Sequence, residues 1–206
     1  MTPNNKTKLK DGAQIRTLSL FAPAPTAKRI DCENYVEGYA ARYEPYVLYY
    51  DGDTPIYERF EPGCFDSCDM SDIIYQYDHA GRVFARTSNG SLIVEPNREG
   101  LFMAADLGRT QAARDHYADI AAGMVTKMSW RFRLGEYYYD ADSHTIVHRT
   151  VAKIYDVSGV SIPANNNTEI NARSWADGVI GAAARSEAEL DERRRRLRLK
   201  LLLLED

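Results

Sequence analysis

The fold is decided by the stretch Lys127-Met128-Ser129-Trp130-Arg131-Phe132. Large apolar side chains alternate here with polar ones, which is the period-two pattern of a β-strand with one buried face. On that pattern the apolar side chains point to one face of the strand, and Ser129 points to the other together with Arg131. We expect Ser129 to be held rigidly, as a nucleophile has to be. An ordinary half-buried strand has the same pattern, and serine reacts only when a base removes its proton.

Most of the chain around this stretch, from about residue 14 to 163, has strand character as well. Fourteen tyrosines favour pleated, half-buried surfaces. The pair Asn89-Gly90 predicts a hairpin between the strands on either side of it. We expect strands, some with bends, over Gln14–Ala22, Tyr35–Tyr50, Val83–Arg86, Ser91–Glu95, Leu101–Leu107, Lys127–Tyr138, Thr145–Tyr155 and Val157–Ile162.

One helix is expected between the strands. Thr110 is a good N-cap for the run that follows it, and Gly123 is placed to end the helix. Many short strands with one or two helices predict a mainly β fold with peripheral helices (α+β), built as a β-barrel or a sandwich. The predicted buried face of the helix consists of Ala113, Tyr117, Ile120, Ala121 and Met124.

The domain organisation follows from a change of composition after Asn165. In the last segment acids precede bases, which suits the dipole of a helix. Its leucines fall seven, four and three residues apart, a coiled-coil-like line that favours contact with a partner over a fully solvated helix. These leucines are Leu190, Leu197, Leu201 and Leu204. We expect a flexible N-terminus over 1–13, one domain over 14–170, a linker of small residues over 171–185 and a C-terminal helix over 186–206.

Composition limits the classes of function. The net charge is −4, with 30 acids and 26 bases, whereas proteins that bind phosphate backbones normally carry a basic excess. No apolar run reaches the roughly 20 residues of a membrane span, and the polar N-terminus has no secretory signal, so we expect a cytoplasmic protein. The cysteines Cys32, Cys64 and Cys68 are expected to be free thiols, because a zinc site needs four ligands and no second Cys/His pair lies near Cys64 and Cys68 in the sequence.

A histidine and an acid in apolar surroundings are further candidates for chemistry. His79 is followed closely by Gly81, which lets another chain segment approach. Asp156 lies in an apolar run and needs a partner if it is buried, and an imidazole N–H, a lysine or a backbone group would serve. Asp78 is a competing acid, but in an extended segment its side chain would point away from that of its neighbour His79. The remaining histidines are His116, His144 and His148.

The order and setting of these residues resemble the prohead (procapsid maturation) proteases of tailed phages, which are similar in turn to the herpesvirus assemblin proteases. The resemblance covers about residues 35 to 170. Two departures stand out: Asp156 replaces the usual glutamate, so its reach to His79 has to come from the backbone, and Trp130 replaces a phenylalanine. The segments that carry the resemblance are Tyr57–Phe65, Asp78–Arg82, Gly90–Leu92, Glu99–Leu101 with the helix that ends at Gly123, Met128–Phe132 and Asp156–Ala164.

The resemblance implies a serine endopeptidase in a closed β-barrel, without metal or cofactor. Ser129 would be the nucleophile, His79 the base and Asp156 the acid that orients the base. The implied substrates are the scaffold protein and the scaffolding domain of the major capsid protein, and often the protease itself, inside the assembling procapsid in the host cytoplasm. The resemblance matches no oxyanion donor, and Arg131 and Arg133, on the face of Ser129, are candidates only.

Several alternatives stay open. One is a cysteine hydrolase that uses Cys64 with His79, because thiolates are strong nucleophiles. Another is a catalytically inactive β-barrel scaffold or assembly protein. The tail over 186–206 would be a handle for scaffold or capsid subunits or the start of a fused scaffold, and the segment Arg173–Ala184 would be a site of self-cleavage. A homodimer or a higher oligomer is also open.

Overall fold

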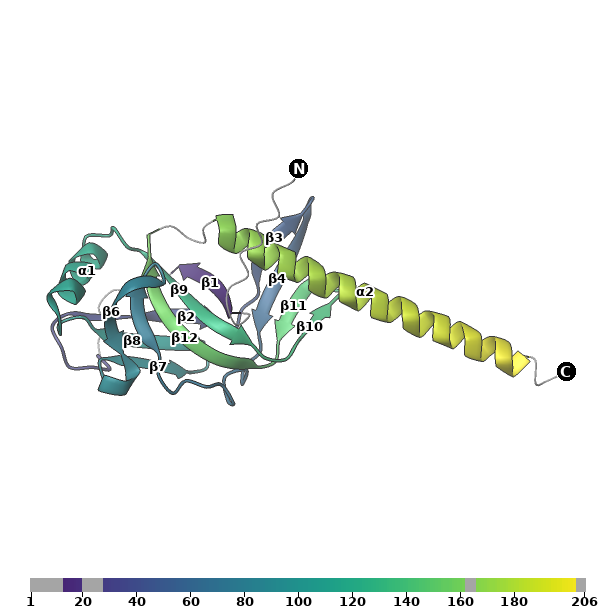
Figure 1. Ribbon diagram of the computed structural model, residues 1–206, viewed down its shortest axis with the longest axis horizontal. Coiled ribbons are helices and arrows are strands. Elements are labelled where there is room, and N and C mark those ends of the chain that lie inside the picture. The colour runs from purple at the N-terminus through teal and green to yellow at the C-terminus, as the bar shows by residue number, and fades with distance from the viewer. Residues whose placement is uncertain (1–12, 20–27, 162–165, 203–206) are drawn as a thin grey trace.

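The computed structural model of the protein describes residues 13–19, 28–161 and 166–202. An elongated body of β-sheet has the helix α1 (Gln111–Ala121) at one end, and the helix α2 (Asn166–Leu202) lies against the other end and projects beyond it (Figure 1). The predicted class, mainly β with peripheral helices, is confirmed. The strands are β1 (Ala13–Ser19), β2 (Tyr35–Arg42), β3 (Tyr46–Asp51), β4 (Thr54–Phe60), β5 (Ile74–Tyr77), β6 (Ala80–Arg86), β7 (Leu92–Pro96), β8 (Gly100–Asp106), β9 (Lys127–Leu134), β10 (Tyr137–Asp140), β11 (Thr145–His148) and β12 (Val151–Val160).

These strands form three hydrogen-bonded sheets. The largest has the order β1-β9-β12-β5-β6, the second β10-β11-β4-β3 and the third β2-β8-β7. β12 runs parallel to β5 and β11 runs parallel to β4, whereas the other neighbours are antiparallel. Within the described residues no sheet closes on itself, so the expected closed barrel is not confirmed.

Some strand predictions were wrong in their boundaries or pairing. The two long strands expected over 127–138 and 145–155 are four, because the ladder is interrupted at residues 135–136 and 149–150. At this interruption the N–H groups of Arg149 and Thr150 both donate to the Glu136 carbonyl, at 2.8 and 3.2 Å. The hairpin expected at Asn89-Gly90 does not form, since β6 and β7 belong to different sheets. A short 3₁₀ helix, η2 (Thr87–Asn89), and Gly90 at φ 71° instead carry the chain from one sheet to the next.

β9 carries the centre of the hydrophobic core. Its Trp130 and Phe132 rings stack with centroids 4.0 Å apart, and the ring of Phe60 from β4 meets Trp130 edge-on at 5.2 Å. The predicted alternation is confirmed on this face, because Met128, Trp130 and Phe132 are all fully buried. Ser129 on the opposite face is fully buried as well. The alternating pattern did not predict this burial, because it indicates a strand with only one buried face.

The helix α1 begins and ends where the sequence predicts. The Thr110 side chain accepts a hydrogen bond from the Ala113 N–H at 3.1 Å, which is an N-cap, and Gly123 follows the last turn at φ 73°. The predicted buried face was wrong at its C-terminal end, because the helix stops at Ala121 and Met124 beyond it is 71% exposed.

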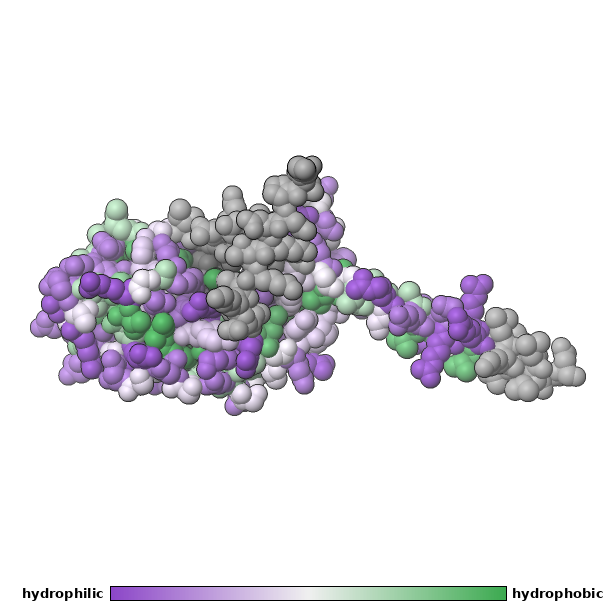
Figure 2. Space-filling view, in the orientation of Figure 1, coloured by the Kyte–Doolittle hydropathy of each residue, from purple (hydrophilic) through white to green (hydrophobic). Residues whose placement is uncertain are grey.

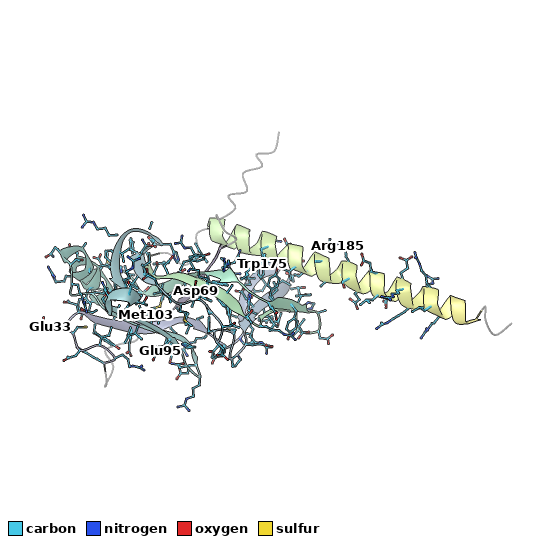
Figure 3. The ribbon with its side chains drawn as sticks, turned by 60° about the horizontal axis from the view of Figure 1, so that its bottom comes forward. Glu33, Asp69, Glu95, Met103, Trp175 and Arg185 are labelled. Atoms are coloured by element: carbon cyan, nitrogen blue, oxygen red, sulfur yellow. The ribbon has the colours of Figure 1, made fainter. Side chains whose placement is uncertain are left out.

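The helix α2 starts earlier than the sequence indicates. Residues 171–185, expected to be a linker, are helical, and so is the segment Arg173–Ala184 that was expected to be open to self-cleavage. The physical reason is a short apolar face: Ala176 is buried and Trp175 and Ile180 pack beside it against the cluster of Ile56 and Ile146. Beyond this contact the helix is exposed and mostly hydrophilic (Figure 2). Trp175 lies against the body, and Arg185 lies where the helix is leaving it (Figure 3).

A buried ionic cluster joins the two larger sheets. Glu58 of β4 receives two hydrogen bonds from Arg16 of β1, at 2.5 Å from Nε and 2.7 Å from Nη2. Tyr46 of β3 donates to the same carboxylate, and the ring Nε2 of His148 of β11 lies 2.9 Å from it. Burial would raise the pKa of the Glu58 carboxyl, but the Arg16 guanidinium and His148 outweigh burial and hold that pKa well below its usual range.

We predict that Glu58→Gln lowers the free energy of unfolding by about 3–5 kcal/mol, because it leaves Arg16 buried without a counter-charge. The folded-state pKa of Glu58 is depressed, so its stabilisation is complete above the unfolded pKa, roughly 4.3, and is lost as the pH falls below it. The difference between wild type and variant should therefore shrink below about pH 4 in urea titrations. Glu99→Gln, which removes an exposed pair with Arg42, is the control and should cost less than about 1 kcal/mol.

Candidate active site

The hairpin between β5 and β6 presents His79. Tyr77 pairs with Ala80, so that Asp78 and His79 form a two-residue loop in which both have positive φ, 48° and 58°. Two successive left-handed residues are the pattern of a type I′ turn, which matches the twist of a hairpin. Gly81 follows at φ 74° with no atom within 4 Å of a Cβ placed there. Its expected role in close chain approach is therefore wrong, and its conformation is what favours glycine.

Asp78 fastens this turn to the end of β12. Its backbone N–H donates to the Gly159 carbonyl at 3.0 Å. Its carboxylate accepts hydrogen bonds from the N–H and the hydroxyl of Ser161, both at 3.2 Å. Asp78 therefore binds Ser161 rather than His79, as expected, although the segment is a turn and not extended.

The structure brings together His79, Ser129 and Asp156. His79 Nε2 lies 2.7 Å from Ser129 Oγ, and His79 Nδ1 contacts Asp156 Oδ1 within hydrogen-bond distance. Ser129 and Asp156 are fully buried, whereas the His79 side chain is 12% exposed. With Nδ1–H donating to the carboxylate, Nε2 is left to accept a proton from the serine hydroxyl.

Asp156 is held from several sides. The pairing of β9 with β12 shifts register between Ile154 and Asp156, which is a local bulge of the kind that re-aims a side chain. Ser158 donates a hydrogen bond to Oδ1 at 3.0 Å, and Arg131 Nε lies 2.8 Å from Oδ2 as an ion pair without hydrogen-bond alignment. The aspartate thus reaches His79 despite its short side chain, and its buried charge has a cation beside it.

The serine hydroxyl has a second neighbour. Ser129 Oγ lies 2.9 Å from the backbone carbonyl oxygen of Arg16, whose strand β1 pairs with β9. A hydroxyl carries one proton, so the Arg16 carbonyl and His79 Nε2 are alternative acceptors for it. The Arg16 carbonyl was not predicted, because the sequence does not reveal that β1 lies beside β9.

Arg131, a candidate oxyanion donor in the sequence, is placed beside the carboxylate of Asp156. It lies directly opposite Asp156 in the β9–β12 register and pairs with that carboxylate. Arg133, two residues further along β9, is exposed. Neither the partnership of Arg131 nor that of Ser158 was predicted, because both depend on the register of two strands distant in sequence.

The other histidines lie elsewhere. His116 Nε2 lies 3.2 Å from Tyr75 Oη, and burial lowers the pKa of His116. His148 belongs to the cluster around Glu58, and His144 lies in the turn after β10, where Tyr139 Oη is 3.0 Å from Nδ1. Each therefore has a local partner outside the trio.

Cys64 is a core residue. It is fully buried beside Phe60 and Phe65, and burial raises the pKa of its thiol to about 12. A thiol with that pKa carries almost no thiolate at neutral pH, which opposes its use as a nucleophile. Across the described part of the chain, no group of three or more His, Cys, Asp or Glu side chains is placed to hold a metal ion. No helix in the same residues is long and apolar enough to cross a bilayer.

An aligned acid, histidine and serine on a mainly β scaffold define the geometry of a serine hydrolase. The chain belongs to the Caudovirus prohead serine protease family, whose sequence model matches residues 24–178. The family expected from the motifs is thereby confirmed. No curated protein and no solved structure matches the chain significantly.

We predict that native protein treated with iodoacetamide near pH 8 is alkylated at Cys32 and Cys68 before Cys64. The first two are partly exposed with thiol pKa values of about 11, whereas Cys64 is buried with a pKa of about 12. Peptide mass mapping gives the order, and labelling in denaturant is the control that should modify all three. Preferential labelling of Cys64 in the native protein would contradict its core position.

Proposed function

We propose that this protein is a phage prohead maturation protease, a serine endopeptidase with Ser129 as nucleophile, His79 as base and Asp156 as orienting acid. The observation that carries the proposal is the hydrogen-bonded chain from Asp156 through His79 to Ser129 in a member of the prohead protease family. Its proposed substrates are the scaffold protein, the scaffolding domain of the major capsid protein and the protease itself. It acts inside the assembling procapsid in the host cytoplasm.

The geometry supports the following reaction. Ser129 Oγ attacks the scissile carbonyl carbon while its proton passes to His79 Nε2, 2.7 Å away. The leaving amine takes that proton from the imidazolium, which leaves Ser129 acylated. Water then attacks the acyl group with His79 again as base, and the proton returns to Oγ as the acid product leaves.

The surroundings of Asp156 support its role. The carboxylate must keep one oxygen on the Nδ1–H of His79 while the imidazole becomes charged. Ser158 and Arg131 hold the carboxylate on its remaining sides, so it keeps its orientation during proton transfer. Burial of both Asp156 and Ser129 keeps water from screening the interaction.

We predict that Ser129→Ala and His79→Ala each lower cleavage roughly 10⁴-fold or more, because the remaining groups cannot activate a nucleophile. The measurement is co-expression with the neighbouring capsid and scaffold genes, followed by intact mass of the capsid protein. Ser143→Ala, in the exposed turn between β10 and β11, is the matched serine control and should cleave normally. Cys64→Ala should also retain cleavage if it folds, as circular dichroism would show.

Two outcomes would overturn the proposal. Loss of cleavage in a folded Cys64→Ala variant with full activity in Ser129→Ala would identify a cysteine hydrolase. Identical capsid-protein masses with wild type and Ser129→Ala would identify an inactive assembly protein.

We predict the activity order wild type, Asp156→Glu, Asp156→Asn. The amide cannot stabilise the imidazolium and favours the wrong tautomer, so Asn should lower kcat about 10⁴-fold. Glutamate keeps the charge but adds a methylene in a fully buried site already occupied by His79, Ser158 and Arg131, so its loss should be smaller. Steady-state cleavage of a peptide from the processed junction gives kcat. An Asn variant as active as wild type would remove Asp156 from the mechanism.

A further inference from the structure

The apolar side chains in the outer half of α2 stay largely exposed within the described chain, although Leu190 lines a hollow with Tyr139 and Ala141 of the body. From Ser186 to Arg198 every residue is exposed, including Leu190 at 51% and Leu197 at 53%. These two leucines are one heptad apart and therefore on one face of the helix. Figure 2 shows apolar side chains set among strongly hydrophilic ones along this projecting part. A helix that exposes leucines in this way is incomplete without a partner.

The charges of the same segment are ordered along the helix. The acids Glu187, Glu189, Asp191 and Glu192 come first, and the bases Arg193, Arg194, Arg195, Arg196, Arg198 and Lys200 follow. Two exposed pairs form inside the helix, Asp191 with Arg194 at 3.3 Å and Glu192 with Arg196 at 2.6 Å. Such exposed pairs are worth only about 0.3–0.5 kcal/mol each, so they hold these charges weakly.

Helix geometry places both signs on each side of the leucine line. At about 100° per residue, Glu187, Asp191 and Arg198 flank the leucines on one side. Glu189 and Arg196 flank them on the other side. Arg194 and Arg193 lie between the two leucines along the helix, one on each side and nearest to the leucine line. Each flank is therefore acidic toward the body and basic toward the far end.

We propose that α2 pairs antiparallel with α2 of a second copy of this chain, across a twofold axis near Arg193 and Arg194. In that arrangement each flank meets the same flank of the partner running in the opposite direction. Leu190 then packs on the partner's Leu197. Asp191 lies beside the partner's Arg198, and Glu189 lies beside the partner's Arg196. Every contact occurs twice, because the axis exchanges the copies.

A parallel pair is opposed by the same charges. It would place acid beside acid before residue 193 and arginine beside arginine after it. Like charges side by side destabilise a helix pair. The antiparallel pair brings like charges together only at the axis, where Arg193 and Arg194 meet their own copies. The order of charges therefore favours the antiparallel orientation and a second copy as the partner. The long arginine side chains can also cover the leucines with their aliphatic stems. This inference does not rest on the proposed protease activity.

The first test is a charge swap in the full chain. The basic variant carries Glu187→Lys, Glu189→Lys and Asp191→Lys, and the acidic variant carries Arg196→Glu, Arg198→Glu and Lys200→Glu. Sedimentation velocity should give a dimer for wild type, a monomer for each variant at the same concentration, and a dimer again when the variants are mixed. Circular dichroism checks that both variants keep their helix content. The wild-type dimer should dissociate as salt is added, because exposed charges are screened.

The second test fixes the orientation by oxidative cross-linking in a Cys32→Ser, Cys68→Ser background. Arg194→Cys lies near the axis and should cross-link to its own copy. Ser186→Cys should not, because its partner copy would be about 22 Å away along an antiparallel pair, at 1.5 Å per residue. Equal cross-linking at both positions would overturn the antiparallel arrangement.

Three results would overturn the proposal itself, the first two from sedimentation velocity and the third from the same measurement with a scaffold or capsid protein added. Wild type could be a monomer up to about 100 µM, well above the Kd of ordinary specific complexes. Both charge variants could remain dimers, which would place the interface elsewhere. Wild type could bind a scaffold or capsid helix through α2 without pairing with itself, which would make the partner a different protein.

Discussion

The pairing of β9 with β12 is the constraint on which the rest of the structure depends. Its register sets Ser129 opposite Ser158 and Arg131 opposite Asp156, so one strand pair supplies the hydroxyl, the carboxylate and the partners of the carboxylate. A slip of one residue would turn every one of these side chains to the other face. The neighbours of this pair complete the site: β1 brings the Arg16 carbonyl to Ser129, and β5 leads into the turn that carries His79.

Arg16 links this pair to the second sheet. Its backbone contacts the Ser129 hydroxyl, while its side chain binds Glu58 among Tyr46 and His148. The guanidinium also lies 5.6 Å from the ring of Trp175, at the place where α2 rests on the body. Arg16, a single buried cationic residue, therefore contacts Ser129, the four-stranded sheet and the base of α2. Because breaking such a pair is costly, these parts are expected to unfold together.

The sequence predicted the local features and missed those that depend on distant pairing. Residue types alone predicted the alternation in β9 and the Thr110 cap. Together with the resemblance to a family, they also predicted that His79, Ser129 and Asp156 are neighbours. The left-handed turn at His79 could not, because neither Asp78 nor His79 is glycine and hairpin twist imposes the conformation. The Arg131–Asp156 pair required a register with a bulge in it. The helical character of 171–185 was missed because its apolar face is short. That face stabilises the helix only by packing against Ile56 and Ile146, which are distant in the sequence.

The continuity of α2 has a mechanical consequence for anything attached to it. A helix that runs from the contact around Trp175 to Leu202 without a break transmits rotation as well as distance. Each residue inserted after the last body contact would advance the outer segment by about 1.5 Å and rotate it by about 100° about the axis. Insertions of seven residues nearly restore the angular phase, whereas insertions of two reverse it. The number of residues between the body and the leucine line thus sets the direction in which the leucines face relative to the body. A change in that number keeps this direction only when it is close to a whole number of helical turns.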